Sequence, residues 1–478
     1  FILNFLKNIA PSYKNWGFVL KFEKNQKYLS RNIDQALLEW KDNPRRKPLL
    51  VRGARQVGKS STIRHLGKSF KYFLEVNVER NPEVMEFFKG SRDVKSIAAK
   101  LSDFFNVPVV PGETLLFLDE IQKSEDVVHS LWFFKEDYPE LHVIAAGSLL
   151  EFALKDLSSF GVGRVSSLFV YPMSFDEFLT ATGQEGLLRT KRNSSPTNPL
   201  PEAFYNRLVE AFRSYMLVGG MPEAVATYME TGSYRYSSDI VNEIIQGYQD
   251  DFAKYGAKAN PLLLRQTLIS VAHQAGAKFV YSRVEGQYRS AEVKVALEML
   301  KDAGLIIPIY HTDANGVPLG AEINERVVKY LIHDTGVLLG ILGIDDDIDG
   351  SIKEMMVADS INLVDKGHVA EMMAGLELIK YSSPQKRHQL YYWQNMNKGT
   401  CAEVDYVIAR SGSIVPIEVK SGVKGSMSSM YSLMRNPQKH IEMGIRCSLE
   451  NFGTFESPDG KKIDIIPLYA ISNLFAEK

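Results

Sequence analysis

The run from Gly53 to Ser60 constrains this chain more than any other feature, because Gly-Ala-Arg-Gln-Val-Gly-Lys-Ser fits the pattern G-x-x-x-x-G-K-[ST]. An apolar segment at 48–51 precedes it, and the helical pattern SSTIRHLGKSF follows it. Glycines let such a loop point successive backbone N–H groups at phosphate oxygens, and the following helix adds the positive end of its dipole. The motif therefore predicts a phosphate-binding loop rather than a chance Gly-rich turn.

The side chains of this loop predict its ligands. Lys59 supplies a mobile positive charge for the outer phosphates, and the Ser60 hydroxyl is placed to ligate Mg²⁺. We therefore expect ATP and Mg²⁺ as cofactors. The predicted nucleotide-binding residues are Gly53, Ala54, Arg55, Gln56, Val57, Gly58, Lys59, Ser60 and Ser61.

Short apolar runs alternate with helical patterns on both sides of the loop. They read PLLVRG, KYFLEVNV, ETLLFLDE, LHVIAAGS and SSLFVYP. Continuous apolar runs of this kind are typical of strands buried on both faces of a parallel sheet. The pattern predicts an α/β fold, in which a P-loop parallel sheet is flanked by helices.

The run TLLFLDE predicts the second half of a nucleotide site. It ends in Asp119 and Glu120, and one further strand separates it from the loop. Asp119 is expected to hold Mg²⁺ through water, and Glu120 to orient or deprotonate the attacking water. The alternative is a buried strand that simply ends in solvated acids.

Two further polar residues follow the next strands. Ser148 is placed to sense the γ-phosphate, although Ser is also a common N-cap for the helix that follows it. Arg164 is a candidate arginine finger, acting on its own nucleotide or on a neighbour's, or else a solvated loop charge.

Length and composition limit the remaining choices. The chain has 478 residues, which corresponds to roughly three domains of about 150 residues. A net charge of -1 argues against a generally basic surface, and two cysteines, Cys401 and Cys447, are too few for a disulfide framework. No apolar run is long enough to cross a bilayer, so we expect a cytoplasmic protein without a membrane partner.

The motifs together resemble the AAA+ superfamily, and more narrowly the prokaryotic AAA+ ATPases that carry a C-terminal domain of unknown function. The matching elements are GARQVGKS, LDEIQ, GSLL, GRVSSLFVYPMSFDEFL and GGMPE. In related ATPases of the STAND and origin-recognition type, a lid proline packs against adenine. The resemblance implies that role for Pro222, although Gly-Gly-Met-Pro would also form a helix-breaking turn.

The region after the lid has the outline of a winged helix. A helical segment from about 260 is followed by a second helix that Ser290 can cap and Gly304 can end, and then by an apolar strand. The second helix would expose Lys294 and Lys301 as a thin basic footprint for DNA. A winged helix used only for packing or protein contact explains the pattern equally well.

The C-terminal region resembles the PD-(D/E)xK nucleases. Asp405 lies on one predicted strand and Glu418 and Lys420 on the next, where strand alternation places the last two on one face. The resemblance implies that Asp405, Glu418 and the upstream Glu371 ligate Mg²⁺, and that Lys420 positions or activates water. EMMA after Glu371 departs from the family, which has Asn and Val there, and a charged hairpin edge is the alternative.

These interpretations divide the chain into successive units. They are an N-terminal helical segment (1–47), an AAA+ P-loop core (48–185), a helical lid (200–258), a winged-helix-like region (259–345) and an α+β nuclease-like domain (351–478).

Two hypotheses for the function remain. In the first, an AAA+ ATPase hydrolyses ATP to ADP and is coupled to a nuclease-like domain that acts on DNA or another nucleic acid. In the second, a STAND-type ATP-dependent switch uses its C-terminal domain only to bind a partner such as a protein. Oligomerisation fits an arginine finger in trans. A kinase-like enzyme fits the LDE strand end less well.

Overall fold

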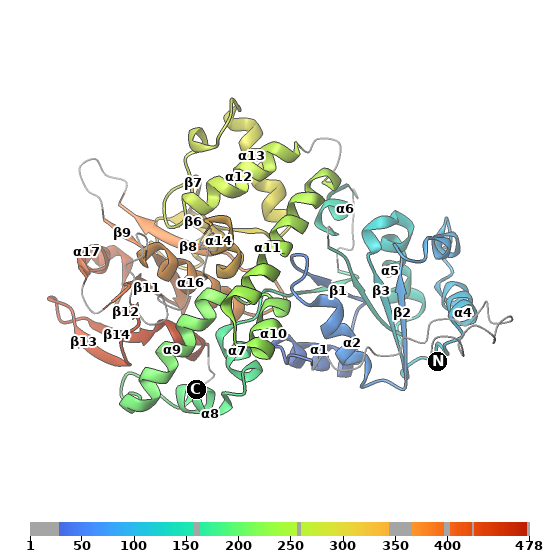
Figure 1. Cartoon of the computed structure of the whole chain (residues 1–478), viewed down its shortest axis with the longest axis horizontal. Coiled ribbons are helices and arrows are strands. Elements are labelled where there is room, and N and C mark those ends of the chain that lie inside the picture. The colour runs from blue at the N-terminus through green and yellow to red at the C-terminus, as the bar shows by residue number, and fades with distance from the viewer. Residues whose placement is uncertain are drawn as a thin grey trace, which may run out of the picture.

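The computed structural model describes residues 28–148, 150–156, 163–255, 260–343, 366–395, 402–422 and 425–475. The start of the predicted N-terminal segment and Cys401 lie outside these residues. One sheet with its helices occupies the right of Figure 1, the C-terminal sheets occupy the left, and helices α7 to α14 lie between them.

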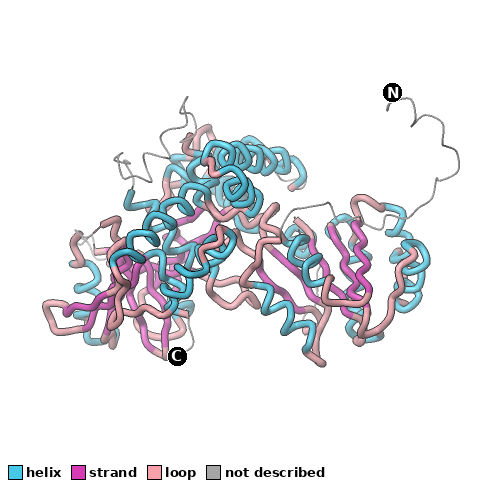
Figure 2. Tube along the Cα trace, turned by 60° about the horizontal axis from the view of Figure 1, so that its bottom comes forward, coloured by secondary structure: helices cyan, strands magenta, loops and turns pink. Residues whose placement is uncertain are grey.

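The N-terminal sheet is parallel and has the strand order β2-β3-β4-β1-β5. Every residue of β3 and β4 is buried, because helices cover both faces of the sheet (Figure 2). The predicted five-stranded parallel sheet is therefore confirmed. Its strands are β1 (Leu49–Arg52), β2 (Tyr72–Asn77), β3 (Thr114–Asp119), β4 (His142–Ala146) and β5 (Ser166–Phe169).

Alternation along β3 divides the hydrophobic core into two parts. Leu116 and Leu118 pack under α3, α4 and α5, whereas Leu115 and Phe117 join a cluster that continues through the middle of the chain into the C-terminal sheets. The P-loop sheet and the C-terminal part therefore share one apolar core. The helices around this sheet are α1 (Ile33–Asp42), α2 (Lys59–Gly67), α3 (Met85–Phe88), α4 (Val94–Phe105), α5 (Glu125–Asp137) and α6 (Leu150–Asp156).

The region predicted as a lid is helical. Pro222 occupies the first turn of α10, where its missing N–H costs nothing, and Gly232 ends that helix with a φ of 66°. The helices of this region are α9 (Glu202–Val218), α10 (Pro222–Thr231) and α11 (Tyr234–Asp251), and α7 (Phe175–Ala181) and α8 (Glu185–Arg192) precede it.

The next region contains the expected order of helix, turn, helix and strand. Gly304, with a φ of 78°, follows the second helix, and the strand after it pairs with an antiparallel partner. The elements are α12 (Pro261–His273), α13 (Ser290–Asp302), β6 (Ile306–Thr312), β7 (Ile323–Ile332) and α14 (Thr335–Ile341).

The C-terminal region is α+β, and one of its sheets extends beyond it. Strand β6 also pairs in parallel with β8, so that a single sheet of order β7-β6-β8-β9 spans the boundary that the sequence suggests near residue 350. The second sheet has the order β10-β11-β12-β14-β13. The elements are α16 (Lys366–Lys380), β8 (Leu390–Gln394), β9 (Glu403–Val404), β10 (Tyr406–Arg410), β11 (Ser413–Val419), α17 (Ser428–Arg435), β12 (Met443–Ser448), β13 (Gly453–Glu456) and β14 (Lys462–Pro467).

None of the helices in the described part of the chain is both long enough and apolar enough to span a membrane.

Gly220, in the predicted lid, packs against the backbone of Met173 in the segment that follows β5. A Cβ atom on Gly220 would lie 2.2 Å from the Met173 carbonyl oxygen, and the Gly220 N–H donates to Asp334 Oδ2 at 2.6 Å. We expect Gly220→Ala to destabilise the protein by about 2 kcal/mol or more, because backbone atoms must move apart. The measurement is the apparent free energy of unfolding in denaturant.

Gly247→Ala is the matched control, because Gly247 lies within α11 and no atom lies within 4 Å of a Cβ placed there. Helix propensity predicts up to about 1 kcal/mol of stabilisation for it. Equal losses for the two variants would contradict the assigned role of Gly220.

Candidate functional site

The phosphate-binding loop has a backbone that requires its glycines. Gly53 has a φ of 147°, and a Cβ atom there would lie 2.2 Å from the Val170 carbonyl oxygen. Gly58 has a φ of 94°, and Gln56 also adopts a left-handed conformation with a φ of 64°. The loop therefore joins β1 to α2 in a conformation that depends on glycine at positions 53 and 58. Ser61 is exposed on the first turn of α2.

Lys59 folds back over this loop. Its ammonium group donates to the carbonyl oxygens of Gly53 at 2.9 Å and Ala54 at 2.7 Å. Burial lowers the pKa of Lys59 to about 8, against the opposing charges of Glu120 and Asp119. The positive charge thus lies where the loop would hold an anion.

Ser60 and Asp119 meet beside Lys59, as the sequence predicts. The Ser60 hydroxyl donates to Asp119 Oδ2 at 3.2 Å. Burial, assisted by the charge of the adjacent Glu120, raises the pKa of Asp119 to about 6. A hydroxyl and a buried carboxylate are oxygen ligands of the kind Mg²⁺ prefers, so these residues fit that ion.

Glu120 is the centre of a second polar group. It has a φ of 55°, and its Oε2 atom accepts from Gln122 Nε2 at 2.5 Å and from the Ser148 hydroxyl at 3.3 Å. The structure thus brings the predicted Glu120 and Ser148 together. Gln122 was not predicted as a site residue, although the run LDEIQ contains it.

Arg164 contacts helix α5 in this structure. Its guanidinium group pairs with Glu136 at 2.9 Å and lies 5.0 Å from the centre of the Trp132 ring. Both partners belong to α5, which offers an acid and an aromatic face. A role as an arginine finger, in cis or in trans, stays a prediction.

Pro222 contacts the loop from the lid. A Cβ atom on Gly58 would lie 3.4 Å from Pro222 Cγ, so the proline ring lies directly against the loop. The position agrees with a residue near the nucleotide, and contact with adenine stays a prediction.

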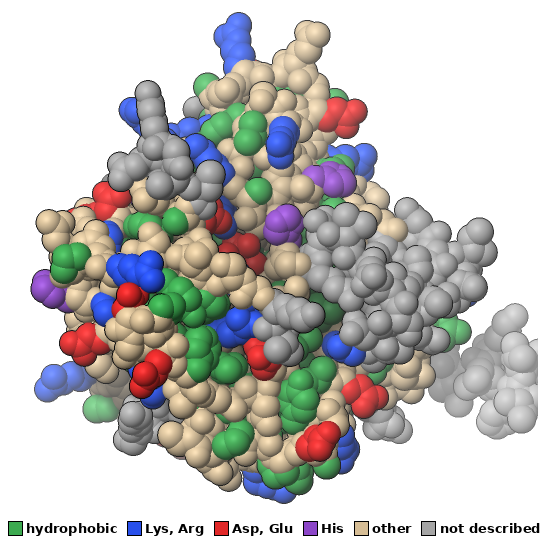
Figure 3. Space-filling view, turned by 90° about the vertical axis from the view of Figure 1, so that its left-hand side faces the viewer, with side chains coloured by type: hydrophobic (Ala, Val, Ile, Leu, Met, Phe, Trp, Pro, Cys, Tyr) green, Lys and Arg blue, Asp and Glu red, His purple; other side chains and the backbone are tan. Residues whose placement is uncertain are grey.

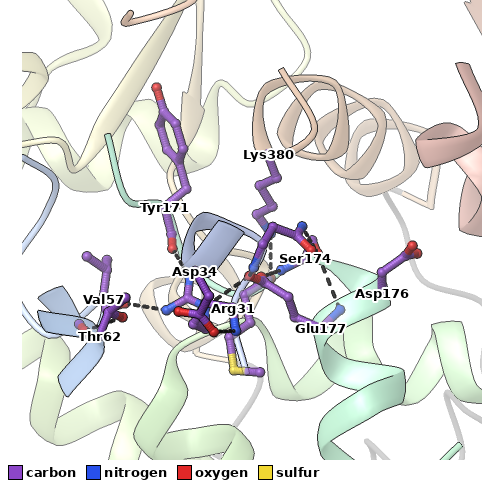
Figure 4. Close-up of polar contacts among 12 residues, drawn as sticks. Arg31, Asp34, Val57, Thr62, Tyr171, Ser174, Asp176, Glu177 and Lys380 are labelled. Atoms are coloured by element: carbon purple, nitrogen blue, oxygen red, sulfur yellow. Dashed lines mark hydrogen bonds and ion pairs between the residues drawn. The ribbon is translucent and has the colours of Figure 1, made fainter. Parts of the chain in front are cut away.

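Arg31 is a residue of this site that the sequence analysis missed. Its guanidinium group donates to the carbonyl oxygens of Val57 at 2.8 Å and Tyr171 at 2.6 Å, and its Nε atom pairs with Glu177 at 3.0 Å (Figure 4). Arg31 is only 8% exposed. It belongs to no motif, because its partners are distant in sequence and two of them are backbone atoms.

The start of α7, at residues 174–177, links Arg31 to the C-terminal region; we call these residues the α7 junction. Glu177 accepts from the Ser174 N–H at 2.6 Å in a capping box, which S-F-D-E signals in sequence. The Phe175 N–H donates to Glu377 of α16 at 3.1 Å, and the Tyr381 hydroxyl donates to Asp176 at 2.9 Å. One short segment thus contacts both the P-loop side and α16.

The lid and the following region also contact the loop. The Tyr248 hydroxyl donates to the Arg55 carbonyl oxygen at 3.1 Å and lies 3.1 Å from His333 Nε2, and the Arg55 side chain pairs with Asp251. Gly304 lies so close that a Cβ atom there would be 3.1 Å from the Ala54 nitrogen. Helix α11 and the turn after α13 are therefore packed on the nucleotide side of the molecule.

The C-terminal residues form a buried cluster of charges. Lys420 pairs with Glu418 at 2.7 Å, and Asp405 Oδ2 accepts from the Val419 N–H at 2.7 Å. Glu371 pairs instead with Lys329 of β7 at 2.9 Å. Burial raises the pKa of Glu371 to about 8, although Lys329 opposes the shift, and raises that of Glu418 to about 7.

In this structure one oxygen of each of these carboxylates accepts from a donor of the protein, namely the Val419 N–H for Asp405, Lys420 for Glu418 and Lys329 for Glu371. Across the described ranges, no three or more His, Cys, Asp or Glu side chains are arranged to hold a metal. The metal site expected from the sequence stays a prediction.

Among the described residues visible in Figure 3, Lys and Arg side chains are interspersed with Asp and Glu. On α13, Lys294 is exposed as expected. Lys301, however, pairs with Glu298 and lines a cavity of about 390 Å³ together with Gly53 and Ala54. Lys301 therefore faces the P-loop side and not an open DNA-binding surface.

Family models match three segments of the chain. Residues 45–179 match an AAA domain. This segment is an AAA-type P-loop domain. Residues 209–348 and 366–471 match two domains of unknown function, DUF8612 and DUF4143. The first of these two segments covers most of the predicted lid (200–258) and all of the predicted winged-helix-like region (259–345).

Other comparisons add little. No curated protein matches the chain. Similar solved structures include Aeropyrum pernix Orc1 in complex with DNA, at 13% identity and a TM-score of 0.29 over 68% of this chain and 95% of that chain. Drosophila ORC bound to DNA gives 15% and 0.25 over 70% and 96%, and the Saccharomyces cerevisiae Hsp104–ADP complex gives 10% and 0.27 over 73% and 44%. TM-scores this low do not establish a common overall fold.

Arg31→Lys tests the role of the guanidinium group. Lysine keeps the charge but not the planar set of donors that holds two carbonyl oxygens and a carboxylate at once. Loss of one or two hydrogen bonds of about 1 kcal/mol each predicts an ATP dissociation constant raised roughly tenfold. The measurement is a calorimetric titration with ATP and Mg²⁺.

Arg192→Lys is the control, because Arg192 also pairs with the α7 junction, at Asp176, but is largely exposed. We expect its ATP affinity to equal that of the unmodified protein. An unchanged affinity for Arg31→Lys would show that the loop does not depend on Arg31.

Proposed function

We propose that this protein binds ATP with Mg²⁺ and hydrolyses it. The observation that carries the proposal is the convergence of Lys59, Ser60, Asp119 and Glu120 beside a loop whose backbone is already shaped for phosphate. Sequence distance makes such a convergence improbable by chance, since Lys59 and Ser60 begin α2, whereas Asp119 ends β3 and Glu120 follows it. The match of residues 45–179 to an AAA domain supports it independently.

Each residue has a role that follows from its position. Lys59 exchanges the Gly53 and Ala54 carbonyl oxygens for phosphate oxygens, which are stronger acceptors. Ser60 and Asp119 would hold Mg²⁺, which neutralises charge that develops on the γ-phosphate. Glu120, oriented by Gln122 and Ser148, aligns the attacking water and accepts its proton.

Nucleotide state is proposed to reach the rest of the chain through the loop's own backbone. Tyr248 of α11 and Arg31 are bonded to carbonyl oxygens within the loop, at Arg55 and Val57. A shift of the loop on binding or hydrolysis therefore alters contacts that continue to His333 on one side and to the α7 junction on the other.

For the C-terminal region we propose a nuclease-like fold, supported by Asp405, Glu418 and Lys420 lying together after α16. In the first functional hypothesis, this region acts on a nucleic acid. The second hypothesis, a regulatory switch whose C-terminal domain binds a partner without cleavage, is favoured by one observation: Lys329 occupies the carboxylate cluster. Either hypothesis is compatible with an oligomer in which Arg164 reaches the nucleotide of a neighbouring chain.

Two substitutions test the ATPase assignment. Lys59→Ala is expected to abolish ATP binding, because the loop loses its only phosphate-directed ammonium group. Glu120→Gln is expected to leave binding within about twofold and to lower kcat by roughly 100-fold or more, because general-base catalysis contributes 10²–10⁴-fold. Steady-state phosphate release and ATP titration measure both. An ATPase rate unaffected by both changes would refute the assignment.

The control is Lys294→Ala, which removes an exposed lysine far from the loop in sequence and should change neither quantity.

A further inference from the structure

Lys329 is fully buried in the middle of β7, and its ammonium group lies among carboxylates from other elements. It contacts Glu371 of α16 at 2.9 Å and Glu403 of β9 at 2.5 Å, and passes 5.0 Å from the centre of the Tyr392 ring of β8. Strands β6, β8 and β9 lie together beside α16 (Figure 1). The lysine therefore reaches across one face of the sheet into the cluster that contains Asp405 and Glu418.

The cluster needs a cation. Glu371 and Glu418 are buried, and buried carboxylates are strongly destabilising unless a positive charge and hydrogen bonds compensate them. The Lys329 ammonium group lies within hydrogen-bond distance of Glu371 and Glu403, so it supplies this compensation from within the chain.

The position of Lys329 is also one that a metal ion would need. Mg²⁺ and Mn²⁺ bind carboxylate oxygens directly, and an ammonium group at hydrogen-bond distance from Glu371 both uses that oxygen and repels a second cation. Glu418 Oε2 is buried without a hydrogen-bond partner, but a single free oxygen does not make a metal site.

The arrangement is part of the sheet and not of a loop. Lys329 pairs with Ile309 of β6, which pairs with Leu390 of β8, and β8 in turn pairs with β9. The Tyr406 hydroxyl donates to the Glu371 carbonyl oxygen at 2.8 Å and holds α16 against the same face. Strand pairing on both sides of β6 thus fixes the backbone from which Lys329 reaches Glu371 and Glu403.

From these contacts we propose that Lys329 is the permanent cation of the C-terminal cluster and takes the place of a metal ion, so that this region does not cleave nucleic acid by metal catalysis. The proposal rests on the nuclease-like assignment made above. Lys329 lies in the segment 209–348 and its partners lie in the segment 366–471, so two separately matched regions combine to form the cluster.

Mn²⁺ titration of the whole protein without nucleotide tests the proposal, with calorimetry and the electron paramagnetic resonance signal of free Mn²⁺ as readouts. In the unmodified protein we expect no Mn²⁺ ion at the C-terminal cluster. Asp405→Asn should therefore leave its Mn²⁺ binding unchanged. Lys329→Met, which keeps the length of the side chain, frees Glu371 and Glu403 and is expected to gain one Mn²⁺ site. Asp405→Asn in the Lys329→Met background should weaken that site at least tenfold. Lys294→Met, an exposed control, should gain none.

The outcomes separate this proposal from the assignments it rests on. Mn²⁺ binding to the unmodified protein that Asp405→Asn abolishes would overturn the role of Lys329 while supporting a nuclease-like site. If neither the unmodified protein nor a folded Lys329→Met variant binds Mn²⁺, Lys329 does not take the place of a metal ion. The nuclease-like assignment would then be wrong as well. If Lys329→Met does not fold, Lys329→Gln, which removes the charge but keeps a polar side chain, replaces it in the same titration. ATP hydrolysis is measured independently through Lys59.

Discussion

The contact of the Arg31 guanidinium group with the Val57 and Tyr171 carbonyl oxygens and with Glu177 holds the nucleotide side of this molecule together. A buried guanidinium group is stable only when its N–H donors are hydrogen-bonded. Here the donors connect the phosphate-binding loop, the segment after β5 and helix α7. Because Glu177 also caps α7, the same ion pair sets where that helix begins. The loop, the strand exit and α7 therefore respond to one another.

The consequence is a protein whose predicted units are not independent bodies. The apolar core continues from the P-loop sheet into the C-terminal sheets, and β6 is shared between the region after the lid and the C-terminal region. Glu377 of α16 accepts directly from the start of α7. The coupling proposed for the phosphate-binding loop therefore has a continuous set of packed elements available to it.

The buried lysines at the phosphate-binding loop and in the C-terminal cluster have different kinds of partner. Near the loop, Lys59 is bonded only to carbonyl oxygens that a phosphate can replace, so the site is ready for an anion. In the C-terminal cluster, Lys329 is bonded to carboxylates, and its charge satisfies them internally. The residue types D, E and K in the expected order predicted that these side chains gather, but not which cation they gather around.

The sequence by itself determined the phosphate-binding loop, the parallel sheet and the pairing of Ser60 with Asp119, because glycine conformation, buried-strand patterns and strand ends are local properties. Only the tertiary structure decided the roles of Arg31, Lys329 and Arg164. Arg31 and Lys329 belong to no motif, and the partner of each cation depends on which carbonyl or carboxylate the fold brings within about 3 Å. Arg164 illustrates the limit, since a motif contains it but only the fold shows that it pairs with Glu136 beside Trp132 of α5.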